Sequence, residues 1–333
     1  MNRNFPNKLF FLIWIVSILL IFGSVRSEET GRGGYAGSFL RMGIGARALG
    51  MGDGSVALAE DGYTAYYNPA ALVFLKNRWF SATCQLMALD RYQYYIGYSQ
   101  AFQGKSTGSD KRGLMRGGFS VGWLSTGVNH IDARDFDGNA IGELSHNEHC
   151  FFFSFALNPD PHLAIGFSGK LLWNRFPGIT DEGDAISATG FGFDIGVLVK
   201  PLDNVSVGLT VRDLRSGYTW DTQNLWVGEG SQTTNTFLRV VRGGVSWKLL
   251  SNHLMLNGDL EKIEYWPVRA VAGIQYEPVD GVFLRTGLRG KAISFGGGYR
   301  FAWVKKLFQM DYAYVPDSVA PSANHVFTWS FIF

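Results

Sequence analysis

The sequence predicts an all-β protein: a transmembrane antiparallel β-barrel of about 14 strands in an outer membrane, with an N-terminal plug in its lumen. Three observations predict it. They are a short apolar leader, a composition rich in glycine and aromatic residues, and a period-two alternation from about residue 78 to the last residue. We therefore divide the 333-residue chain into a signal peptide at 1–27, a plug at 28–77 and a barrel at 78–333.

The first 27 residues have the order of an export signal. Asn2, Arg3 and Lys8 form a basic start, and 9–23 is an almost wholly apolar run of 15 residues. A membrane-spanning helix needs about 20 such residues, so the run fits a signal peptide cleaved before Glu28. An uncleaved inner-membrane anchor is the alternative. Export through a cleaved signal predicts an integral outer-membrane protein.

The composition favours a surface in contact with lipid. The chain has 42 Gly, and its 10 Trp, 14 Tyr and 26 Phe make up 15% of all residues. A membrane barrel displays aromatic side chains to lipid and at both interfaces. The formal net charge of +2 gives no sign of a nucleic-acid partner. Cys84 and Cys150 are too few for a disulfide scaffold, and we expect them unpaired, with a disulfide as the alternative.

The alternation is clearest at the end of the chain. Phe327, Trp329 and Phe331 share one face, while Thr328 and Ser330 lie on the other. Similar segments, each close to the 9–11 residues of a tilted spanning strand, are predicted near 78–86, 91–102, 115–126, 148–158, 162–173, 188–199, 204–213, 237–248, 252–262, 267–277, 281–289, 291–302, 305–315 and 323–333. A soluble β-sandwich, with the apolar faces packed together in a core, is the alternative.

The polar faces of these segments predict a charged lumen. The expected lumen-facing charges are Arg212, Arg242, Asp259, Glu261, Arg269, Glu277, Arg285, Arg300 and Asp311. Connections such as 158–161 and 277–280 are expected as periplasmic turns, and 127–147, 174–187 and 214–236 as outward loops. A barrel of this size lies between those filled by side chains and those with open channels. The glycine-rich stretch 28–77 is therefore expected to fill the lumen.

Within that stretch, 39–52 reads FLRMGIGARALGMG, 56–61 reads VALAED and 65–72 reads AYYNPAAL. This pattern, which covers about residues 37–75, resembles the PorV/PorQ group within the FadL-like (TodX-type) superfamily of 14-stranded barrels with an N-terminal hatch. The terminal Phe333 resembles the signal read by the barrel-assembly machinery. The sequence departs from the pattern at Asp53-Gly54-Ser55, where small apolar residues are expected.

The plug motif consists of Arg41, Gly43, Gly45, Arg47, Gly50, Gly52, Asn68 and Pro69, with a structural or a gating role. Its two arginines are expected to pair with lumenal carboxylates such as Asp259, Glu261 or Asp311. Asn68 before a proline is expected in an extended conformation that closes a local turn.

The resemblance implies two functions. PorV-like proteins are accessories of type IX-type secretion, which bind secreted client proteins and pass them to other secretion components for surface attachment. Contacts would then involve Tyr218, Trp220 and Trp226, whose alternative role is an interfacial girdle. The FadL-like alternative is uptake of hydrophobic small molecules across the outer membrane, which requires an apolar pocket between plug and barrel. We favour the secretion role at this point.

We expect no enzyme activity, cofactor or metal. The sequence has no nucleophile-elbow, phosphate-loop or zinc-protease motif. His146 and His149 lack a visible third ligand, and Asp181, Glu182 and Asp184 lack the spacing of a calcium loop.

Overall fold

A computed structural model describes residues 35–103, 116–178, 185–223, 230–304, 306–317 and 319–333. The predicted signal peptide, Trp226 and the acidic residues at 181–184 lie outside this range. Among the helices within it, none has the length and apolar character needed to cross a membrane.

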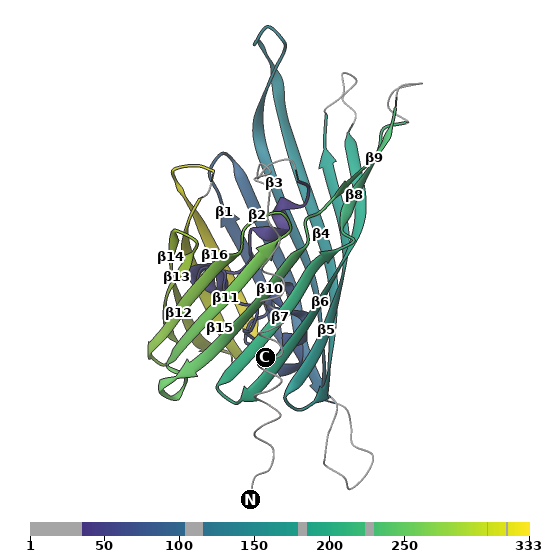
Figure 1. Cartoon of the computed structure of the whole chain (residues 1–333). Helices are drawn as coiled ribbons and strands as arrows, with labels where there is room; N and C mark the ends of the chain where they lie inside the picture. Colours follow the sequence, from purple (N-terminus) through teal and green to yellow (C-terminus); the bar gives the residue numbers. More distant parts are fainter. Residues whose placement is uncertain (1–34, 104–115, 179–184, 224–229, 305, 318) are drawn as a thin grey trace, which may run out of the picture.

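The described residues form one antiparallel sheet of 16 strands, of which β8 and β9 make a hairpin beyond the barrel and 14 make its wall (Figure 1). β1 pairs with both β2 and β16, which closes the barrel. The wall strands are β1 (Trp79–Leu86), β2 (Arg91–Gln103), β3 (Arg116–Arg134), β4 (Ala140–Asp160), β5 (Leu163–Phe176), β6 (Ile186–Leu202), β7 (Val205–Leu214), β10 (Val240–Leu249), β11 (Leu254–Ile263), β12 (Arg269–Val279), β13 (Val282–Arg289), β14 (Ala292–Trp303), β15 (Lys306–Pro316) and β16 (Ala323–Ile332). The predicted 14-stranded barrel is confirmed.

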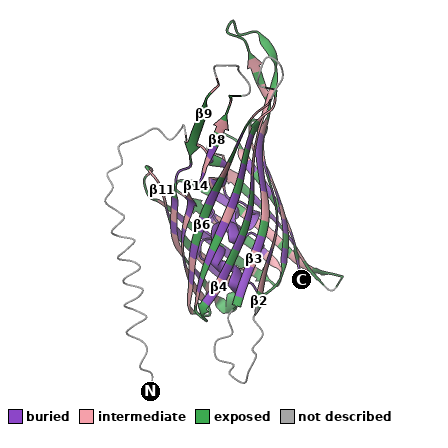
Figure 2. Cartoon of the chain, turned by 90° about the vertical axis from the view of Figure 1, so that its right-hand side faces the viewer, coloured by how far each residue is buried: buried purple, intermediate pink, exposed green. Residues whose placement is uncertain are grey.

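Buried and exposed residues alternate along the strands (Figure 2). In β4, Phe151, Phe153 and Phe155 are exposed, whereas Cys150 and Phe152 are buried inside the barrel. Successive side chains of a strand point to opposite faces, so the aromatic rows form the outer surface. The sandwich alternative, which requires these rows to meet in a dry core, is wrong.

The two ends of the barrel differ. Tight turns follow β4, β6 and β12 at the end that also holds the C-terminus, called here the turn end (Figure 1). At the opposite, loop end, β3 and β4 project as a long hairpin, and β8 (Gly217–Asp221) and β9 (Gln232–Thr236) form a second one. Phe333 lies at the turn end, where its backbone exchanges hydrogen bonds of 2.8 and 3.0 Å with Arg78.

Several predicted boundaries were wrong at the loop end. The segment 127–147 is mostly strand, and 217–221 and 232–236 are strands inside the predicted loop 214–236. Antiparallel pairing, once in register, continues beyond the membrane as a polar hairpin. Sequence criteria based on an apolar face therefore end these strands too early.

The plug consists of short helices inside the barrel: η2 (Ser38–Arg41), α2 (Ala46–Gly50), α3 (Thr64–Tyr67) and η3 (Pro69–Phe74). Asn68 has the extended conformation expected before proline, and its Oδ1 accepts a 3.1 Å hydrogen bond from the Ala70 N–H, which caps η3. Pro69 occupies the first position of that helix, where a missing N–H costs nothing.

Candidate functional site: the plug and the two sectors of the lumen wall

The plug backbone rests directly on several wall strands, two of which lie nearly opposite each other. A Cβ added at Gly287 in β13 would overlap the backbone of Met51 and Gly52, and one at Gly166 in β5 would overlap the backbone at Ala70. Only glycine permits so close an approach between two backbones. The wall is therefore shaped to hold the plug on both sides, but the side chains around the two contacts differ in kind.

The inward faces of β10–β15, called here the charged sector, are centred on Asp53 of the plug. Its carboxylate Oδ2 lies 3.0 Å from Arg242 Nη2 and 3.3 Å from Arg289 Nη2, and Oδ1 lies 2.7 Å from the Tyr67 hydroxyl. The Asp53 carbonyl accepts a further 2.8 Å hydrogen bond from Arg242. Asp53 has a left-handed φ of 73°, which these contacts must hold in place.

Two wall carboxylates extend this network. Glu261 pairs with Arg242 and Arg269 and lies 3.8 Å from Arg289. Asp259 Oδ2 accepts hydrogen bonds of 2.9 and 3.2 Å from the backbone N–H groups of residues 55 and 56 of the plug. The wall thus binds both the side chain and the backbone of the Asp53 turn.

A second network lies beside the first. Arg285 pairs with Asp311 at 2.7 Å and shares the Gln275 side chain with Arg47, at 2.8 and 2.9 Å. Arg47 also pairs with Asp61 of the plug itself at 2.7 Å. Ion pairs and hydrogen bonds therefore link plug and wall through groups that are almost all buried, where electrostatic interactions are screened least.

The structure corrects the expected partners of the plug arginines. Arg47 pairs with plug carboxylates, and Arg41 donates to the Ala36 carbonyl and lies over Trp266. The ion pairs between plug and wall instead join wall arginines, Arg242 and Arg289, to the plug carboxylate of Asp53. Sequence reasoning noted Asp53 only as a departure from a pattern, yet a charged residue in a glycine-rich turn, opposite a lumen rich in arginine, was a usable signal.

Three of the four glycines of the plug motif have a left-handed backbone conformation. Gly43, Gly45 and Gly52 have φ of 84°, 81° and 72°, and Gly50 in α2 packs on the backbone of β14. Of the expected lumen charges, Arg212, Arg242, Asp259, Glu261, Arg285 and Asp311 are buried, while Arg269 and Arg300 are half-buried. Glu277 is half-buried at the turn end, where it accepts a 2.8 Å hydrogen bond from Gly281 N.

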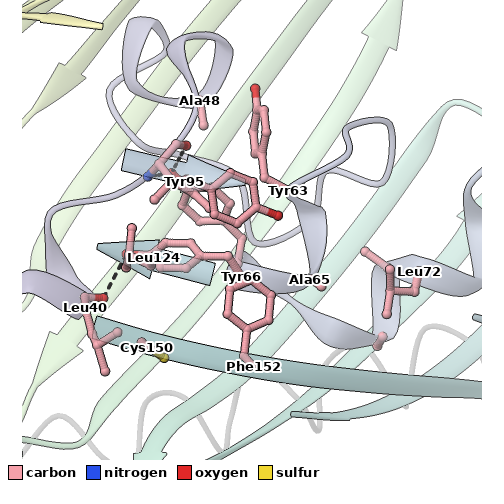
Figure 3. Close-up of a cluster of buried hydrophobic side chains, with 14 of the residues drawn as sticks. Leu40, Ala48, Tyr63, Ala65, Tyr66, Leu72, Tyr95, Leu124, Cys150 and Phe152 are labelled. Carbon is pink, nitrogen blue, oxygen red and sulfur yellow. Dashed lines mark hydrogen bonds between the residues drawn. The ribbon is translucent and has the colours of Figure 1, made fainter. Parts of the chain in front are cut away.

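The inward faces of β2–β5, called here the apolar sector, contact the plug mainly by packing. Tyr95, Leu124 and Phe152 of the wall surround Tyr66 of the plug, and the rings of Tyr95 and Phe152 stack with centroids 6.0 Å apart (Figure 3). Gln93 reaches the Phe39 carbonyl over 3.5 Å, and Ser99 Oγ donates to the Gly62 carbonyl over 2.6 Å. Side-chain ion pairs between plug and wall, frequent in the charged sector, are missing among the described residues of these strands.

A small cavity lies in the apolar sector between plug and wall. It has a volume of about 10 Å³, the space of one water molecule. Its lining is Leu40, Ala65, Tyr66, Leu124, Cys150, Phe152, Ser168, Lys170 and Asp194. The Lys170 ammonium lies 2.7 Å from Asp194 and 2.8 Å from Asp213, which neutralises the polar side of the cavity.

Both cysteines are free. Cys150 faces the cavity, whereas Cys84 in β1 lies opposite the outward-facing Tyr94 and Phe327. The two thiols therefore lie on opposite faces of the wall, and the expectation that they are unpaired is confirmed. His146 and His149 also point to opposite faces of β4, because their positions along a regular strand differ by an odd number, three.

The predicted contact surface at the loop end was wrong for Tyr218. Tyr218 is only 1% exposed, because β8 continues the wall beside β6 and packs Tyr218 against Phe237, while Trp220 is half-buried. Alternation along an unrecognised strand explains this: Tyr218 points inward. A surface role for it would require the hairpin to move.

Comparisons with family models and with curated proteins find no match. Solved structures match in fold. The toluene transporter TbuX of Ralstonia pickettii aligns with a TM-score of 0.58 and 14% identity over 87% of this chain and 98% of that chain. A FadL homologue of Pseudomonas aeruginosa gives 0.56 and 11% over 87% and 98%, and the toluene transporter TodX of Pseudomonas putida gives 0.54 and 14% over 87% and 96%. The chain has the same barrel fold as these three structures.

Proposed function

We propose that this protein is an outer-membrane channel for small apolar molecules, which pass between the plug and the apolar sector. The observation that carries the proposal is the contrast within the lumen. One side of the plug is held by buried ion pairs of Asp53. The other side faces mainly aromatic and aliphatic side chains, with a cavity at the contact whose polar side is the Lys170–Asp194 pair. The similarity to two toluene transporters supports this hypothesis rather than the secretion role.

Passage requires movement, because the cavity has room for about one water molecule. The rings around Tyr66 separate without breaking a hydrogen bond, and the apolar sector otherwise gives up hydrogen bonds from neutral side chains such as Ser99. In the charged sector, the ion pairs of Asp53 must break before the plug leaves. The plug should therefore yield first along β2–β5, at Tyr66 and its wall neighbours.

Cys150 provides a native reporter for this route. In a Cys84→Ser protein reconstituted in liposomes, N-phenylmaleimide should modify Cys150, toluene should slow that reaction, and a permanently charged thiol reagent should react far more slowly. The modification is measured by intact mass. The proposal is wrong if apolar and charged reagents react equally fast or if toluene has no effect.

A matched control moves the thiol to the other sector. Ala313 in β15 is as fully buried as Cys150 and packs on α2 at the charged sector. In a Cys84→Ser, Cys150→Ser background, Ala313→Cys should resist N-phenylmaleimide under the same conditions. Equal reaction of the two thiols would show general loosening of the plug instead of a route.

The secretion role implied by the PorV resemblance stays a prediction. It requires that deletion of the gene impairs export and anchoring of proteins that carry type IX-type C-terminal domains. Normal export in such a strain would remove it.

A further inference from the structure

A polar cluster stands at the loop-end mouth of the apolar sector. The Tyr218 hydroxyl donates to Glu148 Oε1 over 3.0 Å, and Asn174 Nδ2 donates to the same oxygen over 3.3 Å. His146 Nε2 lies 2.7 Å from Asn174 Oδ1. Glu148 precedes Cys150 by two residues on the inward face of β4, so this cluster lies between the loop end and the cavity.

The Tyr218 ring occupies an aromatic slot. Its ring packs edge-on against Phe237 at 4.9 Å between centroids, and Trp220 lies 6.3 Å away in a T-shaped arrangement. Phe176 extends the aromatic surface by contacts with Trp220 at 6.0 Å and with His146 at 4.1 Å. The slot therefore holds a phenol: the rings of Phe237 and Trp220 border the Tyr218 ring, and the Glu148 carboxylate accepts from its hydroxyl.

Tyr218 is held in the slot by a weakly attached hairpin. β8 has five residues and pairs with the wall strand β6 at two positions, through Thr219 and Trp220. Its other neighbour, β9, is exposed over its whole length (Figure 2). Elements with few buried contacts open at low free energy, so withdrawal of the Tyr218 side chain should cost far less than separating two wall strands.

We propose that this slot binds phenols, aromatic rings that carry one hydroxyl group, in place of the Tyr218 side chain. A phenol from outside takes over the contacts that Tyr218 makes outside its own strand, with the Phe237 ring and with the Glu148 carboxylate. A hydrocarbon of the same shape leaves Glu148 Oε1 with the longer hydrogen bond from Asn174 alone. Losing the shorter hydrogen bond of a buried carboxyl group is costly. The inference rests on the proposed channel and names the substrate class that its mouth selects.

The test uses the purified full-length protein in detergent and two probes that differ in one hydroxyl. The first is 4-methylphenol, which reproduces the tyrosine side chain, and the second is toluene. Binding is measured by equilibrium dialysis. Tyr218→Ala empties the slot, and Tyr92→Ala is the matched control, because Tyr92 also bonds β4, through Asn147, but lies on the outward face.

The Tyr218→Ala protein should bind 4-methylphenol at least about tenfold more tightly than Tyr92→Ala does, because the internal competitor is gone. It should also prefer 4-methylphenol to toluene by about tenfold or more, and adding Glu148→Leu should abolish that preference. Equal affinity of the two variants for 4-methylphenol, or equal binding of the two probes to Tyr218→Ala, overturns the proposal.

Two further measurements keep the outcome decisive. If Tyr218→Ala does not fold into a heat-modifiable barrel, the wild type is compared with Glu148→Leu. Only the wild type should then bind 4-methylphenol more tightly than toluene. The same preference in both proteins overturns the proposal. Labelling of Cys150 by N-phenylmaleimide separates the two hypotheses. Normal labelling without a phenol preference removes the phenol assignment alone, whereas loss of labelling removes the channel.

Discussion

The charged sector and the apolar sector contact the same plug through different interactions. On β10–β15, wall arginines and carboxylates bind the Asp53 turn by directional contacts that a shift of 1 Å would break. On β2–β5, rings and aliphatic side chains pack around Tyr66, and the directional contacts to the plug are hydrogen bonds from neutral side chains such as Ser99. The proposed channel requires this difference, with the plug anchored on one side and displaced by a ligand on the other.

The largest effect is expected at the anchor. Asp53→Ala leaves Arg289 without its shortest carboxylate contact and Arg242 with Glu261 alone. Removing one partner of a buried ion pair costs about 3–5 kcal/mol, because the remaining charge stays buried. Urea unfolding followed by tryptophan fluorescence should show this loss in the free energy of unfolding.

The control for this variant is Asp137→Ala, at the exposed tip of the β3–β4 hairpin, which should leave the free energy of unfolding unchanged. If Asp53→Ala were as neutral as Asp137→Ala, the charged sector would not anchor the plug, and the comparison between the sectors would fail.

A smaller effect with a gain of function is expected in the apolar sector. Phe152→Ala removes a ring that is 7% exposed and borders the cavity, so it should cost about 3 kcal/mol and speed modification of Cys150 by N-phenylmaleimide. Phe153→Ala, on the same strand but 55% exposed and facing lipid, is the matched control.

The two phenylalanines also test which face is the inside. Phe153→Ala should change stability much less and leave Cys150 labelling as it is, because lipid chains fill the space of the lost ring. Equal losses from both substitutions would contradict the assignment of the aromatic rows to lipid.

A third, still smaller effect concerns the fit between the backbones of plug and wall. Gly287→Ala places a methyl group against the plug backbone at Met51 and Gly52, which have no room to move beside the anchor. Overpacking of this kind costs about 1–3 kcal/mol. Gly258→Ala is the matched control, since a Cβ there meets no atom closer than 4.0 Å. A stable Gly287→Ala protein would show that the plug can shift on its anchored side.

Much of this architecture follows from local chemistry. Alternation predicted the 14 wall strands. It also predicted that residues such as Arg242 and Arg285 face inward, because successive side chains of a strand point to opposite faces. The pairing of Arg242 with Asp53 required knowledge of where the plug backbone lies, which no periodicity in a glycine-rich segment encodes. β8 was missed for a related reason: five residues within a polar loop give too short a pattern, and pairing with β9 and β6 makes them a strand.

The smallest effect is expected for an ion pair that resembles those of the charged sector but lies in water. Arg239 and Glu264 pair at 2.8 Å at the loop end, and the hydrogen bond from Arg239 lowers the pKa of Glu264 below its ordinary value of 4.5. A depressed carboxyl pKa stabilises the fold above the unfolded value and loses this contribution as the pH falls through the folded pKa. Because the pair is exposed, Glu264→Gln should cost less than about 1 kcal/mol at pH 7, and the difference from wild type should vanish at acidic pH. Unfolding curves at pH 7 and at acidic pH measure the difference in the free energy of unfolding. If Glu264→Gln lowered that free energy at pH 7 as much as Asp53→Ala does, burial of the charges beside the plug would not explain how the charged sector holds the plug.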